Sequence, residues 1–416
     1  MPVANINPTR LWRRLLELGE IGKDPAGGVT RLAFTPADRE ARELVMEWMR
    51  GAGLTVRVDA IGNIFARLEG TAPGRGVVLL ASHLDTVPQG GRFDGALGVL
   101  AALEAVETLV ERGLKPQQPV EVGVFVNEEG ARFKGGLLGS SAVVHGVTPE
   151  ELRQLVDDQG ISCYQALADF GLDPEQVAAA RRSPAEFAAY LELHIEQAAV
   201  LEAEGLPVGV VTGIAGPKFI TVRLTGRADH AGATPMHLRR DALAGAAELI
   251  LAAERIAREE AGPATVCTVG QIRVAPGATN VIPGSCEFSL DLRDIQLEDR
   301  ERAETRLKVE FERVCRRRGL EGEWLPGEGF PPVRLDESMV TLLGTACREA
   351  GQREFRLVSG AAHDAMQFAG VCPVGMLFVR SVDGISHSPE EYTTPEDAAV
   401  GAEVLFHALC QLVAAR

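Results

Sequence analysis

Carboxylate and imidazole side chains stand directly after apolar segments of this 416-residue chain. His83 and Asp94 lie in the stretch ASHLDTVPQGGRFDGALG, which begins at the end of an apolar run. Glu128 and Glu129 follow a second apolar run, at residues 120–126. Imidazole and carboxylate groups at neighbouring strand ends can hold two divalent metal ions, and one carboxylate remains to act as a base. This pattern predicts a metal-dependent hydrolase.

Two further histidines complete the predicted pair of metal sites: His194 in LELHIEQ and His387 in GISHSPEEY. We expect the first ion to be held by His83, Asp94 and His194. We expect the second to be held by Asp94, Glu129 and His387, so that Asp94 bridges both ions. Imidazole combined with carboxylate suits Zn, Mn, Co or Ni better than Mg or Ca. Three protein ligands per ion leave room for a shared water, whose pKa two cations lower toward neutrality.

Glu128 has a different expected role. Neighbouring side chains diverge where a strand ends, so Glu128 cannot easily bind the ion that Glu129 binds. A carboxylate beside an activated water is a natural general base. Any one of these residues alone would be an ordinary cap, surface charge or packed side chain, as we expect for His407 in the last helix. The combination favours a metal site, because most of the histidines lie in glycine- or proline-rich segments.

The elements around these residues predict an α/β fold. An uninterrupted apolar strand at residues 76–81, an alanine-rich helix at 96–112 and the strand at 120–126 form a β-α-β unit. Ligands of open α/β sheets bind at the carboxyl ends of the strands, which is where His83 and Glu128 stand. We therefore expect a mixed sheet covered by helices.

Between residues 213 and 331 the pattern changes, and it predicts a small inserted α+β sandwich. The expected elements are a strand at 219–225, a helix at 241–258, strands at 265–274 and 286–293, and a charged helix at 298–317. We expect a catalytic domain built from residues 1–212 and 332–416. Its last helix should begin at Thr394-Pro395, a favourable N-cap and first-turn pair.

Composition excludes several other classes of protein. The net charge of −16 and the lack of a basic patch argue against binding to nucleic acid. The seven cysteines are scattered without a CxxC pair, which argues against a disulfide framework or a thiolate metal site. The chain shows neither a signal-peptide pattern nor an apolar stretch of membrane-spanning length. We expect a cytoplasmic protein that binds no membrane.

The motifs together resemble the M20 metallopeptidase clan. They are HLDTV, the Glu-Glu pair, ELHIEQ, RADHAGATPM, GATNVIPG and GISHSPE, in order along nearly the whole chain. They are most similar to the branch of N-carbamoyl-L-amino acid hydrolases and allantoate amidohydrolases. His194 is diagnostic, since peptidases and aminoacylases of the clan commonly have an acidic residue there. The resemblance implies that the insert is a lid that also forms a homodimer. Ala362 replaces the usual glycine in SGAAHDA, which affects only the expected geometry of that loop.

The resemblance also implies residues that bind the substrate. His230 resembles a residue that reaches the partner's active site to stabilise the oxyanion, and Asn280 and Arg293 resemble groups that bind the substrate carboxylate. The sequence supports Arg293 independently, because the apolar residues 288, 290 and 292 face the other way and leave it on the polar face. A guanidinium there can pair with a carboxylate in a bidentate fork. The alternative is a salt bridge from Arg293 to Asp291 or Asp294.

Three further residues have weaker assignments. Gln197, three residues after His194, could reach the ureido group of a substrate if this segment is helical, and is otherwise a solvated amide. Gly360 and His363 resemble residues of the active-site loop, although a glycine there can simply serve a turn.

The expected reaction is hydrolysis of the ureido group of an N-carbamoyl-L-α-amino acid to the amino acid, ammonia and CO2. Glu128 would act as the base, and His230 would stabilise the oxyanion. Allantoate is the alternative substrate, although FVRSVDGISHSPEEY is more similar to carbamoylases. A general aminoacylase or dipeptidase is disfavoured by His194. A catalytically dead ligand-binding relative is disfavoured because all five ligands and Glu128 are present.

Overall fold

The computed structural model describes residues 5–72 and 74–413, with the backbone alone at residue 328, and divides into two compact units. Unit 1 comprises the described residues up to Thr212, Leu335–Leu357 and the described residues from His363 onward. Unit 2 comprises Gly213–Arg334 and Val358–Ala362. Residues 332–334 and Val358–Ala362, which we expected in the larger domain, thus belong to unit 2. In the described ranges, no helix is both long and apolar enough to span a membrane.

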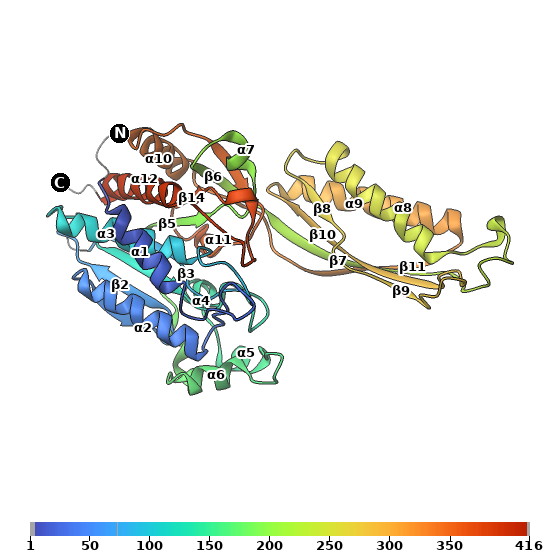
Figure 1. The fold of residues 1–416 in the computed structure, drawn as a ribbon, viewed down its shortest axis with the longest axis horizontal. Helices are drawn as coiled ribbons and strands as arrows, with labels where there is room; N and C mark the ends of the chain where they lie inside the picture. The colour runs from blue at the N-terminus through green and yellow to red at the C-terminus, as the bar shows by residue number, and fades with distance from the viewer. Residues whose placement is uncertain (1–4, 73, 414–416) are drawn as a thin grey trace. The chain divides into compact units, whose positions relative to one another are not determined.

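Nine strands of the described chain form one mixed sheet, in the order β1-β2-β4-β3-β5-β14-β6-β12 with β13 beside β6 (Figure 1). The strands are β1 (Thr55–Val58), β2 (Ile64–Leu68), β3 (Val77–His83), β4 (Val120–Phe125), β5 (Phe187–Ile195), β6 (Val208–Ile214), β12 (Val333–Arg334), β13 (Arg356–Ser359) and β14 (Val374–Val379). β4, β3, β5 and β14 are adjacent and parallel. Their carboxyl ends therefore meet at one edge of the sheet. β1 and β2 pair antiparallel at one side, and β14 pairs antiparallel with β6 at the other.

Helices cover both faces of this sheet, and the side chains of β5 show which helix lies on which face. The side chain of Leu193 lies against Gly401 of α12 (Pro395–Val413), and the backbone oxygen of Leu193 lies so close to Gly98 of α3 (Ala96–Glu111) that it leaves no room for a side chain there. Tyr190, which faces the opposite way, stacks on Phe368 of α11 (Ala365–Phe368) with ring centroids 4.4 Å apart. Because both faces are covered, β3, β4 and β14 are buried along their whole length, as their apolar sequences require. The predicted fold class is confirmed.

Side-chain caps mark the starts of two helices of unit 1, and the last helix begins where the sequence predicts. Asn7 accepts a hydrogen bond from the backbone N–H of Arg10 and caps α1, and Thr394 accepts one from Asp397 at the start of α12. The α-helices are α1 (Pro8–Leu18), α2 (Pro36–Gly51), α3 (Ala96–Glu111), α4 (Leu138–Val144), α5 (Pro149–Gln154), α6 (Cys163–Asp169), α7 (Val200–Glu204), α10 (Glu337–Glu349), α11 (Ala365–Phe368) and α12 (Pro395–Val413). Short 3-10 turns lie at η1 (Pro174–Ala180), η2 (Pro184–Glu186) and η5 (Val382–Gly384).

Unit 2 is an antiparallel five-stranded sheet with two long helices packed on one face (Figure 1). Its elements are β7 (Gly216–Thr225), η3 (Met236–Leu238), α8 (Ala242–Arg255), η4 (Ile256–Glu260), β8 (Val266–Thr268), β9 (Ile272–Ala275), β10 (Ser285–Asp294), α9 (Leu297–Arg318) and β11 (Glu321–Gly329). The single strand expected at 265–274 is wrong, since it divides into β8 and β9, which pair with different parts of β10. β11 was not predicted, because proline and glycines interrupt its sequence, yet it pairs along β7.

Candidate metal centre

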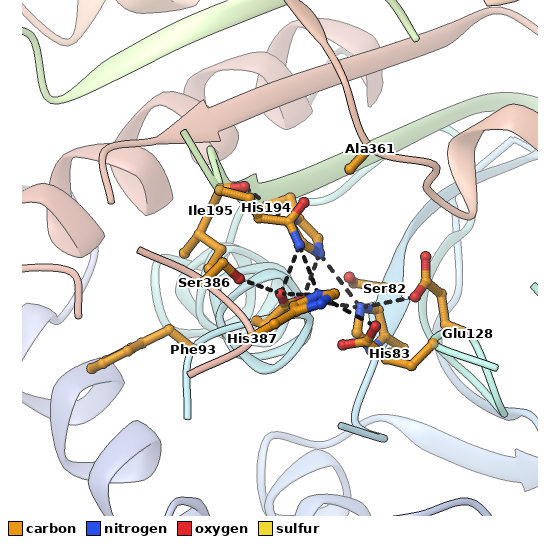
Figure 2. A network of polar contacts seen from close by, with 12 residues as sticks. Ser82, His83, Phe93, Glu128, His194, Ile195, Ala361, Ser386 and His387 are labelled. Atoms are coloured by element: carbon orange, nitrogen blue, oxygen red, sulfur yellow. Dashed lines mark hydrogen bonds and ion pairs between the residues drawn. The ribbon is translucent and has the colours of Figure 1, made fainter. Parts of the chain in front are cut away.

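Four parallel strands bring imidazole and carboxylate groups together at the carboxyl edge of the sheet in unit 1 (Figure 2). His83 ends β3, and His194 lies near the end of β5. Glu128 and Glu129 follow β4, and His387 lies in the loop after β14. Asp94 lies in the loop that leads from β3 to α3.

The two oxygens of Asp94 face different imidazoles. Its Oδ1 lies 3.1 Å from His194 Nε2 and 3.5 Å from His83 Nε2, and the two imidazole nitrogens are 3.4 Å apart. Its Oδ2 lies 3.5 Å from His387 Nε2, which is 3.4 Å from Glu129 Oε2. Within each of these two groups of three residues, ligand atoms lie within 4.8 Å of one another. The first group is buried, whereas the side chain of His387 is 48% exposed, so the second group opens toward solvent.

Both buried imidazoles are held with Nε2 facing Asp94. His83 Nδ1 donates to the carbonyl oxygen of Asp85, and His194 Nδ1 donates to that of Ile195, each at 3.0 Å. Carbonyl oxygens only accept hydrogen bonds, so each Nδ1 carries a ring proton and Nε2 is the nitrogen that faces the site. In the neutral form, each ring would offer its Nε2 lone pair to a metal ion.

The local backbone is adapted to this arrangement. Gly95 has a positive φ of 63°, and a Cβ at this position would overlap the ring of His83. Gln197 and His387 also have positive φ, 59° and 54°, a conformation that non-glycine residues adopt at a cost of about 1–3 kcal/mol. The surrounding structure therefore stabilises strained backbone at two site residues.

The donor set fits divalent cations. Glu129 Oε1 is buried and has no hydrogen-bond partner among the described residues. Burial, together with the neighbouring Asp94, raises the pKa of Glu129 to about 7. Burial opposes the charged form of Asp94, but His194 and the other imidazoles hold its pKa well below the usual range. A positive charge between these groups would satisfy the free oxygen and relieve the repulsion between carboxylates.

Glu128 lies beside both groups but belongs to neither. Its Oε2 is 3.6 Å from His83 Nε2, whereas Glu129 points toward His387, so the two side chains diverge. Burial raises the pKa of Glu128 well above its usual range, and the nearby Asp364 adds to this effect. The carboxyl group therefore has a high affinity for a proton, as a general base beside a reacting water needs.

Asp85 accepts hydrogen bonds from three of these residues, a role that was not predicted from the sequence. Its carboxylate accepts the backbone N–H groups of Glu128 and Glu129 at 3.1 and 3.2 Å, while its carbonyl oxygen accepts His83 Nδ1. The signal was present, since Asp85 is the aspartate of HLDTV, two residues after a predicted ligand.

A third grouping consists of Glu192, His194 and His363. The carboxylate of Glu192 already accepts hydrogen bonds from Ser82, Tyr190 and the backbone N–H of residue 365. Both of its oxygens are therefore occupied by buried groups of the protein. The ring of His363 lies against that of His194 with centroids 4.5 Å apart. Burial and the neighbouring His194 hold the pKa of His363 well below its usual range, which keeps this imidazole neutral beside the metal-binding groups.

Gln197 lies in the site, although its segment is not helical, the condition under which we expected it to reach a substrate. The chain leaves β5 at Ile195 and turns through the positive φ of Gln197 before α7 begins at Val200. The amide Nε2 donates to Asp94 Oδ2 at 2.7 Å, and Oε1 is buried without a partner among the described residues. This oxygen is free to accept a hydrogen bond from a ligand.

The remaining predicted site residues belong to unit 2. His230 Nδ1 accepts the backbone N–H groups of Gly232 and Ala233, both at 3.1 Å. His230 bridges to Val281, which places Asn280 beside it. The ring proton of the neutral imidazole must then lie on Nε2, which becomes an exposed hydrogen-bond donor.

Arg293 lies on the polar face of β10 and forms the salt bridge that was the alternative expectation. Its Nε and Nη2 donate to the two oxygens of Asp291 at 2.9 and 2.8 Å, and Nη1 donates to Gly360 O at 2.7 Å. These contacts use three of the five N–H groups of the guanidinium. Two N–H groups remain, and the three bonds orient them.

Comparison with known proteins identifies the family of the chain. Residues 79–411 match the family described as peptidase family M20/M25/M40. An N-carbamoyl-L-amino acid amidohydrolase of Geobacillus stearothermophilus is 50% identical, over 98% of this chain and 99% of the relative. An allantoate deiminase of Arabidopsis thaliana is 37% identical, over 94% of this chain and 80% of the relative. A hydantoinase/carbamoylase family amidase from Burkholderia multivorans superposes with a TM-score of 0.93 at 38% identity, covering 98% of both chains. The chain belongs to peptidase family M20/M25/M40.

Proposed function

We propose that this chain hydrolyses the ureido C–N bond of N-carbamoyl-L-α-amino acids and that it binds two divalent cations, Zn, Mn, Co or Ni, per subunit. The observation that carries the proposal is the division of the Asp94 oxygens between two imidazole groups, with Glu128 alongside. The amidohydrolase of Geobacillus stearothermophilus, identical at half of the aligned positions, supports the substrate class. Allantoate is the second candidate, supported by the allantoate deiminase relative.

His83, Asp94 and His194 would hold one cation, and Asp94, Glu129 and His387 the other. When bound, the cations would polarise the carbamoyl carbonyl and make a water molecule more acidic. Glu128 accepts the proton of the attacking water and passes it to the leaving nitrogen. The amino acid leaves with this proton, and the carbamic acid that remains decomposes to CO2 and ammonia, so that one water is consumed overall.

His230 is suited to stabilise the oxyanion that forms during attack. The two backbone N–H groups on Nδ1 fix the proton on Nε2, so the imidazole presents a donor and not a base. Oriented donors of this kind typically contribute about 3–4 kcal/mol to stabilisation of the transition state. Gln197 Oε1 is placed to accept an N–H of the ureido group.

Arg293 is suited to bind the substrate carboxylate through its two remaining N–H groups. Asp291 and the carbonyl oxygen of Gly360 hold the guanidinium in place, so little side-chain entropy remains to be lost on binding. The salt bridge to Asp291 thus positions the residue for this role.

Two copies of the chain are needed to assemble this site. Asn280 and His230 adjoin the start of β10, whereas Arg293 lies near its end, opposite Pro217. The eight steps from Ser285 to Arg293 span about 26 Å at roughly 3.3 Å per residue. This length far exceeds an N-carbamoyl amino acid, so Arg293 and His230 of one subunit cannot bind the same substrate molecule. Donation of His230 and Asn280 by the partner of a homodimer removes this conflict.

Ammonia release tests the proposal. The metal-loaded protein should release ammonia from a panel of N-carbamoyl-L-amino acids with kcat/KM above that for allantoate. A preference for allantoate would replace the substrate assignment. Release of free amino acid from dipeptides or N-acetyl amino acids, with no ammonia from any N-carbamoyl substrate, would refute it.

A further inference from the structure

A buried carboxylate outside both metal-binding groups connects the loops that carry Asp94 and His387. Glu391 is only 4% exposed, and its Oε1 accepts the backbone N–H groups of Phe93 and Asp94, each at 3.0 Å. Its Oε2 lies 2.9 Å from Ser386 Oγ, and this hydroxyl also lies 2.9 Å from Asp94 Oδ2. Glu391 therefore contacts the backbone of one predicted ligand and, through Ser386, its carboxylate.

The backbone opposite Glu391 leaves space for this carboxylate. A Cβ at Gly91 would overlap both Oε1 and Cδ of Glu391. Any side chain at position 91 would thus displace the carboxylate from the N–H groups of residues 93 and 94. This steric requirement for glycine at position 91 is a separate observation from the hydrogen bonds of Glu391.

An aromatic contact joins the same two loops. The Phe93 ring meets the Tyr392 ring edge-on at 5.7 Å and stacks on Trp12 of α1 at 5.6 Å. Glu391 precedes Tyr392 in the chain and accepts the backbone N–H groups of both Phe93 and Asp94. The loops at residues 91–94 and 386–392 are therefore joined by a polar and an apolar contact.

We propose that Glu391 is a positioning residue that fixes the Asp94 carboxylate relative to His387 and so sets the affinity of the second cation. The inference rests on the proposed function, because it presumes that the second group binds a cation. His387 lies in the loop at 386–392, whereas His83 and His194 belong to central strands. Loss of Glu391 should therefore weaken the second site more than the first.

The test measures metal binding directly. Mn²⁺ is titrated into the metal-free protein by calorimetry, with the wild type, Glu391→Ala, Glu391→Gln and Gly91→Ala compared. Glu390→Ala is the matched control, since this neighbouring glutamate is exposed. Outer hydrogen-bond partners of ligands typically contribute roughly 10- to 100-fold in metal affinity, so Glu391→Ala should lose that much at the weaker of two sites.

Two variants distinguish a role of Glu391 in positioning Asp94 from a role in the stability of the fold. Glutamine at position 391 keeps an oxygen for the two N–H groups and offers an N–H to Ser386, so Glu391→Gln should bind both ions nearly as the wild type does. Gly91→Ala should weaken the second site although Glu391 is intact. Far-UV circular dichroism checks that each metal-free variant is folded. If Glu391→Ala does not fold, Glu391→Gln and Gly91→Ala carry the test.

Each outcome has one reading. Selective loss of the second ion in Glu391→Ala or Gly91→Ala, with recovery in Glu391→Gln, supports the positioning role. Unchanged binding in the alanine variants, or equal weakening of both ions, overturns it. If the wild type itself does not bind two Mn²⁺ ions per subunit, the failure belongs to the proposed function and not to Glu391.

Discussion

Mixing two inactive variants tests whether the active site is shared between subunits. Glu128→Gln removes the proposed base, and His230→Ala removes the proposed oxyanion donor. In a mixed dimer, the subunit that retains Glu128 receives an intact His230 from its Glu128→Gln partner. The other site lacks both groups. One functional site per mixed dimer is therefore expected.

The magnitude follows from the geometry and from random pairing. The proposed donation by the partner rests on the separation of about 26 Å along β10 between Ser285, on the side of Asn280, and Arg293. An equal mixture in a two-fold symmetric dimer contains about half mixed dimers, each with one working site of two. Activity should rise to about a quarter of the wild-type value per subunit, because half of the dimers each contribute half of their sites.

The assay is ammonia release after subunit exchange, and each variant alone provides the background. Mixed dimers are counted separately by native mass spectrometry with one isotopically labelled variant. A mixture that contains the mixed dimers but stays at background would refute donation by the partner and return His230 to its own subunit.

Two further predictions concern single residues. Glu128→Gln should keep both metal ions but lose roughly 10²–10⁴-fold in kcat, since an amide cannot accept the proton, and near wild-type turnover of the fully metallated variant would remove Glu128 from the mechanism. Arg293→Lys should raise KM roughly 10- to 100-fold, because a charged hydrogen bond contributes about 1.5–3 kcal/mol and lysine cannot reproduce the paired donors. The matched control is Arg273→Lys, a change of an arginine on the exposed strand β9. Equal losses on a substrate whose carboxylate is amidated would show that Arg293 is structural.

The residues around the metal centre show which features a sequence can predict. The bounds of β3 and β4 could be predicted to within a few residues, because strands buried on both faces need uninterrupted apolar runs. The polar residues at the ends of these runs could then be expected at one edge of the sheet. The conformation at Gln197 could not be decided from the sequence, which gives no sign of its positive φ. β11 is held by its pairing with β7, which no local pattern reveals.

The supporting groups show the same limit. Asp85 and Glu391 stand within motifs that the sequence made conspicuous, yet their roles depend on backbone N–H groups that lie more than 40 and nearly 300 residues away along the chain. Arg293 was expected on the polar face from the alternation along β10, and it lies there. Its bond to the carbonyl oxygen of Gly360 joins segments 67 residues apart and could not be read from that alternation.

Metal content of Asp94→Ala is the most direct test of the central claim that Asp94 bridges two cations in a hydrolytic site. The wild type and the variant are loaded with Mn²⁺ and passed through a desalting column. The manganese bound per subunit is then measured by inductively coupled plasma mass spectrometry. Glu390→Ala serves as the control for a lost surface carboxylate. Two ions per subunit are expected in the wild type and in Glu390→Ala. Asp94→Ala should hold neither ion tightly and should not release ammonia. Two tightly held ions in a folded Asp94→Ala protein would contradict the claim that Asp94 bridges two cations.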